Sequence, residues 1–325
     1  MLDVDLKPAP GTLKSAAIIL IVVLIPSSIA TAIGGEAAGM AFGLAAGLVM
    51  AVSPYATNAQ AIGSAVLTSA LAALAVLAGT TPWAVALLMM ASAILLALTN
   101  QHSAGLMTLA PIVVIIMGPA GLDLTWSQAM LYVFAGGIFG WLVVRIFKFD
   151  AVPMPVPQAV AWRHAIVLGV LTAASLYWSL ANNVPHGYWI AVTLLMALRP
   201  LPEQRKDTLT ARLLGTLLGA MIALVVIVVL PTQAAVAVAA VCLLLLAAYS
   251  MSGNYFLQTM FLTPMLLIFT TLGDQSEGVE SSVERVVFTV VGVALGVVAA
   301  VVLERWDRRD MPVTDHEPHT DSVPD

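Results

Sequence analysis

Charge is what this sequence has least of. Only 10% of its 325 residues are Asp, Glu, Lys or Arg, whereas 60% are hydrophobic. A soluble protein carries about 25% charged residues, so this chain cannot cover its apolar surface by folding alone, and it belongs in a lipid bilayer. The net charge of -5 and the absence of any Lys/Arg run longer than a pair also argue against nucleic acid as a partner.

Cysteine and long polar segments are almost as scarce. The single cysteine, Cys242, lies in an apolar run, which excludes an internal disulfide and a cysteine-based metal site. No polar stretch is long enough for a sizeable soluble domain, and no G-x-x-x-x-G-K-[ST], H-E-x-x-H or G-x-S-x-G motif occurs. We therefore expect neither an ATP-driven pump nor an enzyme, and no metal or cofactor.

Long apolar runs are what the sequence has instead. A bilayer core needs about 20 apolar residues per helix, and breaks at Gly, Pro, Asn and charged residues divide the chain into twelve candidate spans. The first six are Leu13–Ile33, Ala37–Val52, Ala56–Ala78, Pro82–Leu98, Ser103–Met117 and Trp126–Phe147, and the second six are Ala165–Leu180, Gly187–Leu198, Leu209–Leu230, Ala234–Tyr249, Tyr255–Leu272 and Val283–Leu303. We expect an all-α membrane protein with about twelve transmembrane helices.

The basic residues give this arrangement a direction. When successive loops are assigned alternately to the two sides of the membrane, 12 of the 13 Lys and Arg residues lie on one side, and only Arg285 lies on the other. The positive-inside rule makes the basic face cytoplasmic. We therefore expect a multi-pass protein of the bacterial inner membrane with both termini in the cytoplasm. On this assignment no span carries a charged residue at mid-depth.

The two halves of the sequence resemble each other. Gly63-Ser64 matches Gly215-Thr216, the segment Met107–Pro111 matches Met260–Pro264, and Gly136 and Gly140 match Gly292 and Gly296, at offsets that rise slowly along the chain. This pattern predicts two parallel six-helix repeats. The expected boundaries are an N-terminal cytoplasmic segment 1–12, repeats at 13–148 and 164–306, a linker at 149–163, and a disordered cytoplasmic tail at 307–325.

A run of motifs in the second half resembles a known family. His186–Thr193 contains a Tyr-Trp pair, Arg199-Pro200 follows, and Arg212–Ala220 reads R-L-L-G-T-L-L-G-A. These motifs resemble the signature of the fusaric acid resistance / aromatic acid exporter family over roughly 161–306. The resemblance implies an inner-membrane efflux protein for aromatic or other organic acids that works with a periplasmic adaptor and an outer-membrane channel. Larger members carry a cytosolic domain where this chain has only Phe149–Arg163.

The expected substrate site follows from broken helices. Short or proline-interrupted spans at matching positions of two repeats tend to line the transport path, because their freed backbone groups must be satisfied there. The second and eighth spans are short, and the fifth and eleventh carry Pro111 and Pro264 in mid-span; ordinary proline kinks are the alternative. The predicted substrate-binding residues lie between the halves and are Met107, Pro111, Tyr188, Trp189, Thr193, Met260, Thr263 and Pro264.

Several of these residues also have structural interpretations. Tyr188 and Trp189 suit an interfacial aromatic belt as well as they suit substrate stacking, and the methionines suit packing. Arg199 and Arg212 are assigned to a cytoplasmic mouth that attracts anions, although they could simply determine topology. His102, His164 and Glu284 are the candidates for proton coupling, since no buried carboxylate is available.

The predicted function is secondary efflux of small organic acids, aromatic ones above all, driven by the proton-motive force. A passive organic-anion channel and an accessory subunit of a larger export complex are the alternatives. Membrane lipids, the organic-acid substrate, a periplasmic adaptor protein, an outer-membrane channel and further copies of the chain are the expected partners.

Overall fold

The computed structural model describes residues 11–102, 107, 110–148, 155–270 and 275–309. Within these residues the chain is helical and has no strand, which confirms the expected all-α class. The helices are α1 (Thr12–Gly34), α2 (Glu36–Val52), α3 (Asn58–Ala78), α4 (Pro82–Asn100), α5 (Ala110–Met117), α6 (Trp126–Ile146), α7 (Gln158–Ala181), α8 (Trp189–Ala197), α9 (Pro202–Val229), α10 (Thr232–Ser252), α11 (Tyr255–Thr270) and α12 (Gln275–Arg309), with a short 3-10 turn at Ser53–Tyr55.

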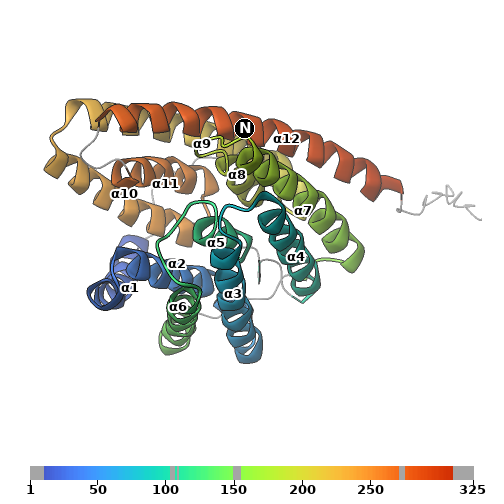
Figure 1. The fold of residues 1–325 in the computed structure, drawn as a ribbon, viewed down its shortest axis with the longest axis horizontal. Coiled ribbons are helices and arrows are strands. Elements are labelled where there is room, and N and C mark those ends of the chain that lie inside the picture. The colour runs from blue at the N-terminus through green and yellow to red at the C-terminus, as the bar shows by residue number, and fades with distance from the viewer. Residues whose placement is uncertain (1–10, 103–106, 108–109, 149–154, 271–274, 310–325) are drawn as a thin grey trace, which may run out of the picture.

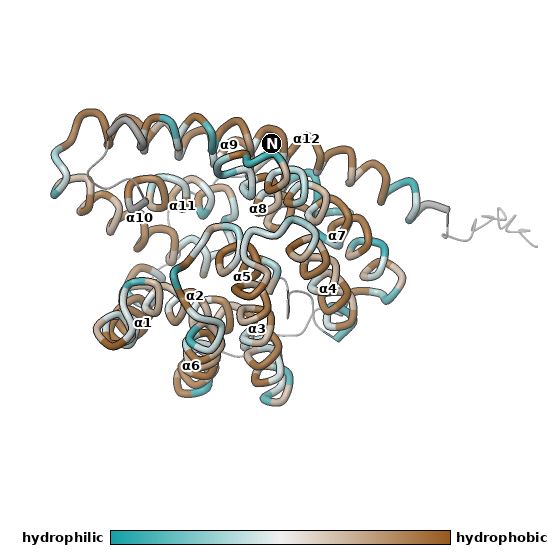
Figure 2. The backbone as a smooth tube through the Cα atoms, viewed as in Figure 1, coloured by the Kyte–Doolittle hydropathy of each residue, from teal (hydrophilic) through white to brown (hydrophobic). Residues whose placement is uncertain are grey.

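Most of these helices have the length and composition of membrane spans. In the described part of the chain, nine helices are long and apolar enough to cross a bilayer. The hydrophobic colour covers most of their length in Figure 2, while hydrophilic residues gather towards their ends. Large apolar side chains such as Ile25, Leu87 and Val225 are exposed on their outer faces, as a lipid-facing surface requires.

Three helices are too short for this role. At 1.5 Å per residue, the 8 residues of α5 and the 9 residues of α8 extend only about 12 and 14 Å, well under the roughly 30 Å of a bilayer core. The apolar part of α11, Tyr255–Ile268, is also short. Twelve full crossings are therefore not confirmed, although the short eighth span is; the first residues of the expected fifth span lie largely outside the described residues.

The first half packs around α6. Its Gly136 and Gly140 lie against the backbone of α2 at Phe42 and Ala46, so closely that neither position has room for a Cβ atom. Helix α6 also packs on α3, and α5 packs on α3. The two halves then meet mainly where α4 lies beside α7, with a second contact between α1 and α10 (Figure 1).

The second half is built on the same kind of contact. Gly215 and Gly219 of α9 lie against the backbone of α11, and Gly292 of α12 lies against α8. Helix α12 also packs along α9 and runs the length of one side of the molecule in Figure 1. These close approaches bring α8, α9, α11 and α12 together as one four-helix group.

The predicted repeat agrees with these contacts but stays a prediction. The matched glycines Gly136 and Gly292 lie on α6 and α12, and they contact α2 and α8, which are matched helices in the proposed alignment. The domain boundaries at 1–12, 149–163 and 307–325 fall partly outside the described residues and also remain predictions.

Candidate functional site

Two arginines lie inside the second half. Arg212 of α9 is 0% exposed and Arg285 of α12 is 1% exposed. The sequence analysis did not predict that either arginine would be buried inside the protein. Hydropathy assigned both residues to span ends, but α9 begins at Pro202 and α12 at Gln275. Each arginine thus lies ten residues, or about 15 Å, inside its helix, and Arg212 does not lie at an exposed cytoplasmic mouth.

Neither guanidinium has a charged partner among the described residues. Nε, Nη1 and Nη2 of Arg212 and Nη1 and Nη2 of Arg285 are buried and make no hydrogen bond. The guanidinium of Arg285 lies over the ring of Trp189, with its carbon 3.4 Å from the ring centroid. The two positive charges are also near enough to repel each other. We call Arg212 and Arg285 the arginine pair.

Four threonines complete the same interior. Their hydroxyls are buried without a hydrogen-bond partner, and each belongs to a different helix of the four-helix group. They are Thr193 of α8, Thr216 of α9, Thr259 of α11 and Thr289 of α12. Because residues four apart share one helix face, Thr216 lies on the face of Arg212 and Thr289 on the face of Arg285.

The packing of the helices shows that these threonines are near one another. Thr193 contacts α12 at Gly292, less than one turn from Thr289, and Thr259 contacts α9 at Gly215, which precedes Thr216. We call the arginine pair together with these four threonines the arginine–threonine cluster. It is a buried group of hydrogen-bond donors with a positive charge.

Burying such a group is costly. A guanidinium stays protonated in proteins, and a buried charge without a partner costs several kcal/mol. The stack on Trp189 offsets part of this cost for Arg285, but it leaves the in-plane N–H groups of the guanidinium free to donate. The chemistry that satisfies the cluster is therefore an anion with several acceptor oxygens.

The end of the short helix α8 is satisfied by other residues. His164 Nε2 lies 2.9 Å from the Leu198 carbonyl oxygen. Arg205 donates from Nε to the Arg199 carbonyl at 3.1 Å and from Nη2 to the Pro200 carbonyl at 2.6 Å. These carbonyls belong to the C-cap residue of α8 and the two residues after it, where non-helical backbone inside a membrane protein needs donors. His164 and Arg205 thus have structural tasks that the arginine pair does not have.

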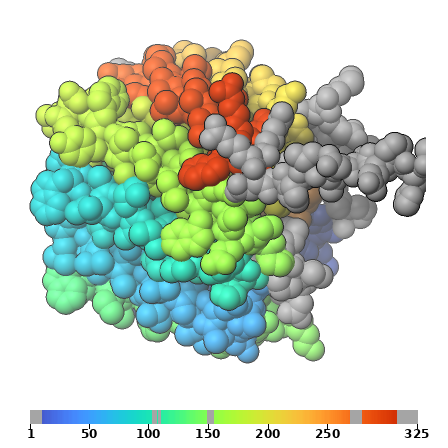
Figure 3. Space-filling view, turned by 90° about the vertical axis from the view of Figure 1, so that its right-hand side faces the viewer, coloured from blue at the N-terminus to red at the C-terminus, as the bar shows by residue number. Residues whose placement is uncertain are grey.

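Ion pairs hold α12 at two levels, one beside Arg285 and one beyond the Arg212 end of the cluster. His186 Nδ1 lies 2.6 Å from Glu284 Oε2, and we call this contact the upper pair. Asp307 binds Arg163 at 3.0 Å and Arg205 at 3.3 Å, which we call the lower triad. Figure 3 shows this end of α12, in red, against the yellow-green α7. The two levels are 23 residues or about 34 Å apart along α12, close to the thickness of a bilayer core.

The structure distributes the predicted substrate residues over two places. Trp189 and Thr193 contact the arginine–threonine cluster or belong to it, and the Tyr188 ring lies 5.1 Å from that of Trp189. Thr263 donates to the Thr259 carbonyl at 3.1 Å, and Pro264 lies against Gly219 beside Met260. Six of the eight residues thus belong to the second half and lie near its interior.

Met107 and Pro111 lie elsewhere, at the contact between the halves. The Met107 sulfur accepts a hydrogen bond from Ser64. Pro111 is the second residue of the described part of α5, and residues 108 and 109 lie outside the described residues. Of the two matched prolines, Pro264 lies inside its helix α11, and an interruption at Pro111 stays a prediction.

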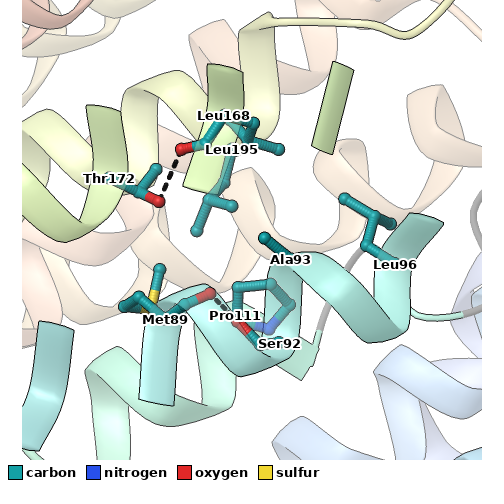
Figure 4. Close-up of a pocket in the computed structure, with 8 residues that line it drawn as sticks. All are labelled: Met89, Ser92, Ala93, Leu96, Pro111, Leu168, Thr172 and Leu195. Atoms are coloured by element: carbon teal, nitrogen blue, oxygen red, sulfur yellow. Dashed lines mark hydrogen bonds between the residues drawn. The ribbon is translucent and has the colours of Figure 1, made fainter. Parts of the chain in front are cut away.

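Pro111 also lines a small cavity between α4, α5, α7 and α8 (Figure 4). Its lining is apolar except for Ser92 and Thr172. Both hydroxyls already donate to carbonyls of their own helices, Ser92 to Met89 at 2.8 Å and Thr172 to Leu168 at 2.7 Å. The cavity therefore offers no free polar group to an organic acid.

The remaining predicted residues have separate environments. Arg199 is half-buried and lies over the Tyr255 ring, 5.4 Å from its centroid. His102 is exposed, and His164 caps α8. Glu284 has His186 as its partner.

Sequence reasoning missed Arg285, Thr216, Thr259 and Thr289 as site residues. One signal was present, because Arg212 precedes Thr216 and Arg285 precedes Thr289 by the same four positions. That spacing places both groups on one helix face in α9 and again in α12. Only the packing of the two helices shows that these faces meet.

Comparisons with known proteins point to the same half of the chain. Residues 158–299 match the family described as fusaric acid resistance protein-like. The chain is also similar to the inner membrane protein YccS of Escherichia coli strain K12, at 28% identity over 158 residues, which cover 48% of this chain and 22% of the relative. The similarity thus spans about a fifth of that relative's length, and no solved structure gives a significant match.

The matched region contains the entire arginine–threonine cluster, from Thr193 to Thr289. The resemblance drawn from the Tyr-Trp, Arg-Pro and Arg-Gly-Thr motifs is thereby confirmed. The second half of this membrane protein, residues 158–299, carries the sequence pattern of the fusaric acid resistance protein-like family.

Proposed function

We propose that this chain exports small organic anions from the cytoplasm across the bacterial inner membrane, and that the arginine–threonine cluster binds them. The single observation that carries the proposal is the arginine pair, two fully buried guanidiniums without a carboxylate partner among the described residues. A carboxylate supplies the missing charge and acceptor atoms. The similarity to an inner membrane protein supports the location.

The ion pairs at the two levels of α12 support a transport cycle. An anion can leave the buried cluster only if α12 separates from α7 and α9 at the lower triad or from the segment before α8 at the upper pair. Opening one contact while the other holds is alternating access. Proton coupling belongs to the proposal as well, with Glu284, which precedes Arg285 in the sequence, and its partner His186 as the candidate groups. A periplasmic adaptor and an outer-membrane channel remain proposed partners.

Transport in proteoliposomes tests the proposal. The full chain should export labelled benzoate against its concentration gradient when a pH gradient is imposed. Arg212→Gln and Arg285→Gln should each reduce that flux at least tenfold, because a buried charge contact is worth roughly 2–5 kcal/mol. Lys206→Gln is the matched control, since Lys206 is an exposed cation on the same helix α9.

Three outcomes contradict the proposal. A benzoate conductance that follows the membrane voltage and ignores the pH gradient would make the chain a passive channel. If correctly inserted protein shows no benzoate flux and no benzoate conductance, the result would favour an accessory role in a larger export complex. Full transport by both arginine variants would place the path outside the arginine–threonine cluster.

A further inference from the structure

We infer that the arginine–threonine cluster selects dicarboxylates, small organic molecules whose two carboxylates are separated by a short scaffold. The inference rests on the proposed function, because it names the charge and shape of the anion that the same cluster takes. Three observations carry it: the charge count, the donor count and the levels at which the two arginines attach.

The charge count favours a dianion. The cluster holds two guanidiniums, and none of the described residues places a carboxylate in it. Glu284, the neighbour of Arg285 in sequence, binds His186, and Asp307 on the same helix binds Arg163 and Arg205. Neither carboxylate therefore neutralises the arginine pair. A monoanion leaves one uncompensated positive charge in a buried site, whereas a dianion leaves none.

The donor count agrees with the charge count. Arg212 has five N–H donors and the terminal nitrogens of Arg285 have four, all on atoms without a partner. One carboxylate offers about four acceptor positions, so it leaves about half of these donors unsatisfied. Two carboxylates offer about eight, which nearly matches the guanidinium donors before any threonine hydroxyl is used.

The two arginines attach at different levels of the four-helix group. Arg205 binds Asp307, and Leu209 contacts Gly296 further along, so α9 and α12 run antiparallel. Measured from the Leu209–Gly296 contact at 1.5 Å per residue, Arg212 attaches about 4.5 Å and Arg285 about 16 Å along the bundle. The pair therefore reaches into the cluster from two ends rather than from one point.

The threonines occupy the space between these levels. By the same measure Thr216 and Thr289 both attach about 10 Å along the bundle, and Thr193 contacts Gly292 a little below them. The order of the attachment points along the axis is thus arginine, threonines, arginine. A ligand with one carboxylate at each end and a small, weakly polar middle matches this order, and a single compact anion does not.

Binding to the purified full chain tests this inference. The probes share one ring and differ in charge: benzoate, phenyl phosphate and benzene-1,4-dicarboxylate. We expect the wild-type protein to bind the dicarboxylate at least tenfold more tightly than benzoate, since one additional buried charge contact is worth 1.4 kcal/mol or more. Arg212→Gln and Arg285→Gln should each abolish this preference and bind benzoate at least as well as the dicarboxylate, whereas Lys206→Gln should keep it.

A loss of preference, rather than a loss of binding alone, separates recognition from a structural role, because a misfolded site would lose both probes together. One result would overturn this inference and leave the proposed function standing. In that result the wild-type protein binds benzoate and the dicarboxylate with equal affinity, and binding of both is lost only when the two arginines are replaced together. Tighter binding of phenyl phosphate would overturn the two-group geometry. Failure of all three probes to bind would contradict the proposed function itself.

Discussion

Two residues define the chemistry of this molecule. Arg212 and Arg285 are among the largest fully buried side chains of the described part of the chain, in a protein with very few charged residues. A buried guanidinium without a counter-charge lowers stability. Residues that oppose stability in this way are typical of functional sites, where binding requires them.

This reasoning predicts that Arg212→Met stabilises the ligand-free protein. Methionine fills a similar space without the charge, and replacing buried charges by apolar side chains is neutral or stabilising by about 1–4 kcal/mol. The midpoint of thermal unfolding in detergent should therefore stay the same or rise, while the preference for a dicarboxylate over benzoate disappears. The ion-paired Arg205 is the contrasting position: Arg205→Met should lower the midpoint, because it leaves Asp307 and two backbone carbonyls with fewer donors. A large fall for Arg212→Met would show that Arg212 has a structural role.

At the scale of the helix, the sequence predicted more than it did at the scale of the residue. Apolar runs located the long helices, and the short eighth span was predicted because polar residues close it on both sides. The burial of the arginines was missed, since α9 and α12 are 28 and 35 residues long and begin several residues before the apolar runs that defined them. The contacts of Gly215 and Gly292 decide which helix faces meet, and a single sequence does not contain that pairing.

Helix α12 carries both ion-pair levels, so loosening one of them should expose the cluster from one side only. We expect Glu284→Gln to weaken the upper pair with His186, which lies at a partly exposed position (His186 40% and Glu284 23% exposed). The accessible reporter is Thr289→Cys in a Cys242→Ala background, which removes the only native cysteine.

Labelling of that cysteine from the outer side by a membrane-impermeant thiol reagent should rise severalfold, in line with the 0.5–3 kcal/mol typical of coupled neighbours. Glu280→Gln is the control on the same helix, because Glu280 is exposed. Equal labelling in both backgrounds would show that the upper pair does not close the cluster.

The two halves of the molecule differ in the polar residues of their interiors. Both halves are packed by glycine contacts between matched helices, yet the arginine–threonine cluster lies entirely within the second. At the positions that the repeat aligns with Arg212 and Thr216, the first half has Gln60 and Ser64. The predicted binding place between the halves, near Met107 and Pro111, is apolar and its hydroxyls are already bonded. We therefore expect the proposed site to bind one anion per chain.

Locating a bound anion directly tests the central claim of this account, that the arginine pair holds the transported anion. Crystals of the full chain grown with 4-iodobenzoate would reveal the iodine by its anomalous scattering. The account predicts one peak inside the group formed by α8, α9, α11 and α12, with the carboxylate within hydrogen-bond distance of Arg212 or Arg285. An iodine peak between the halves beside Met107 and Pro111, with none at the arginine pair, would contradict it.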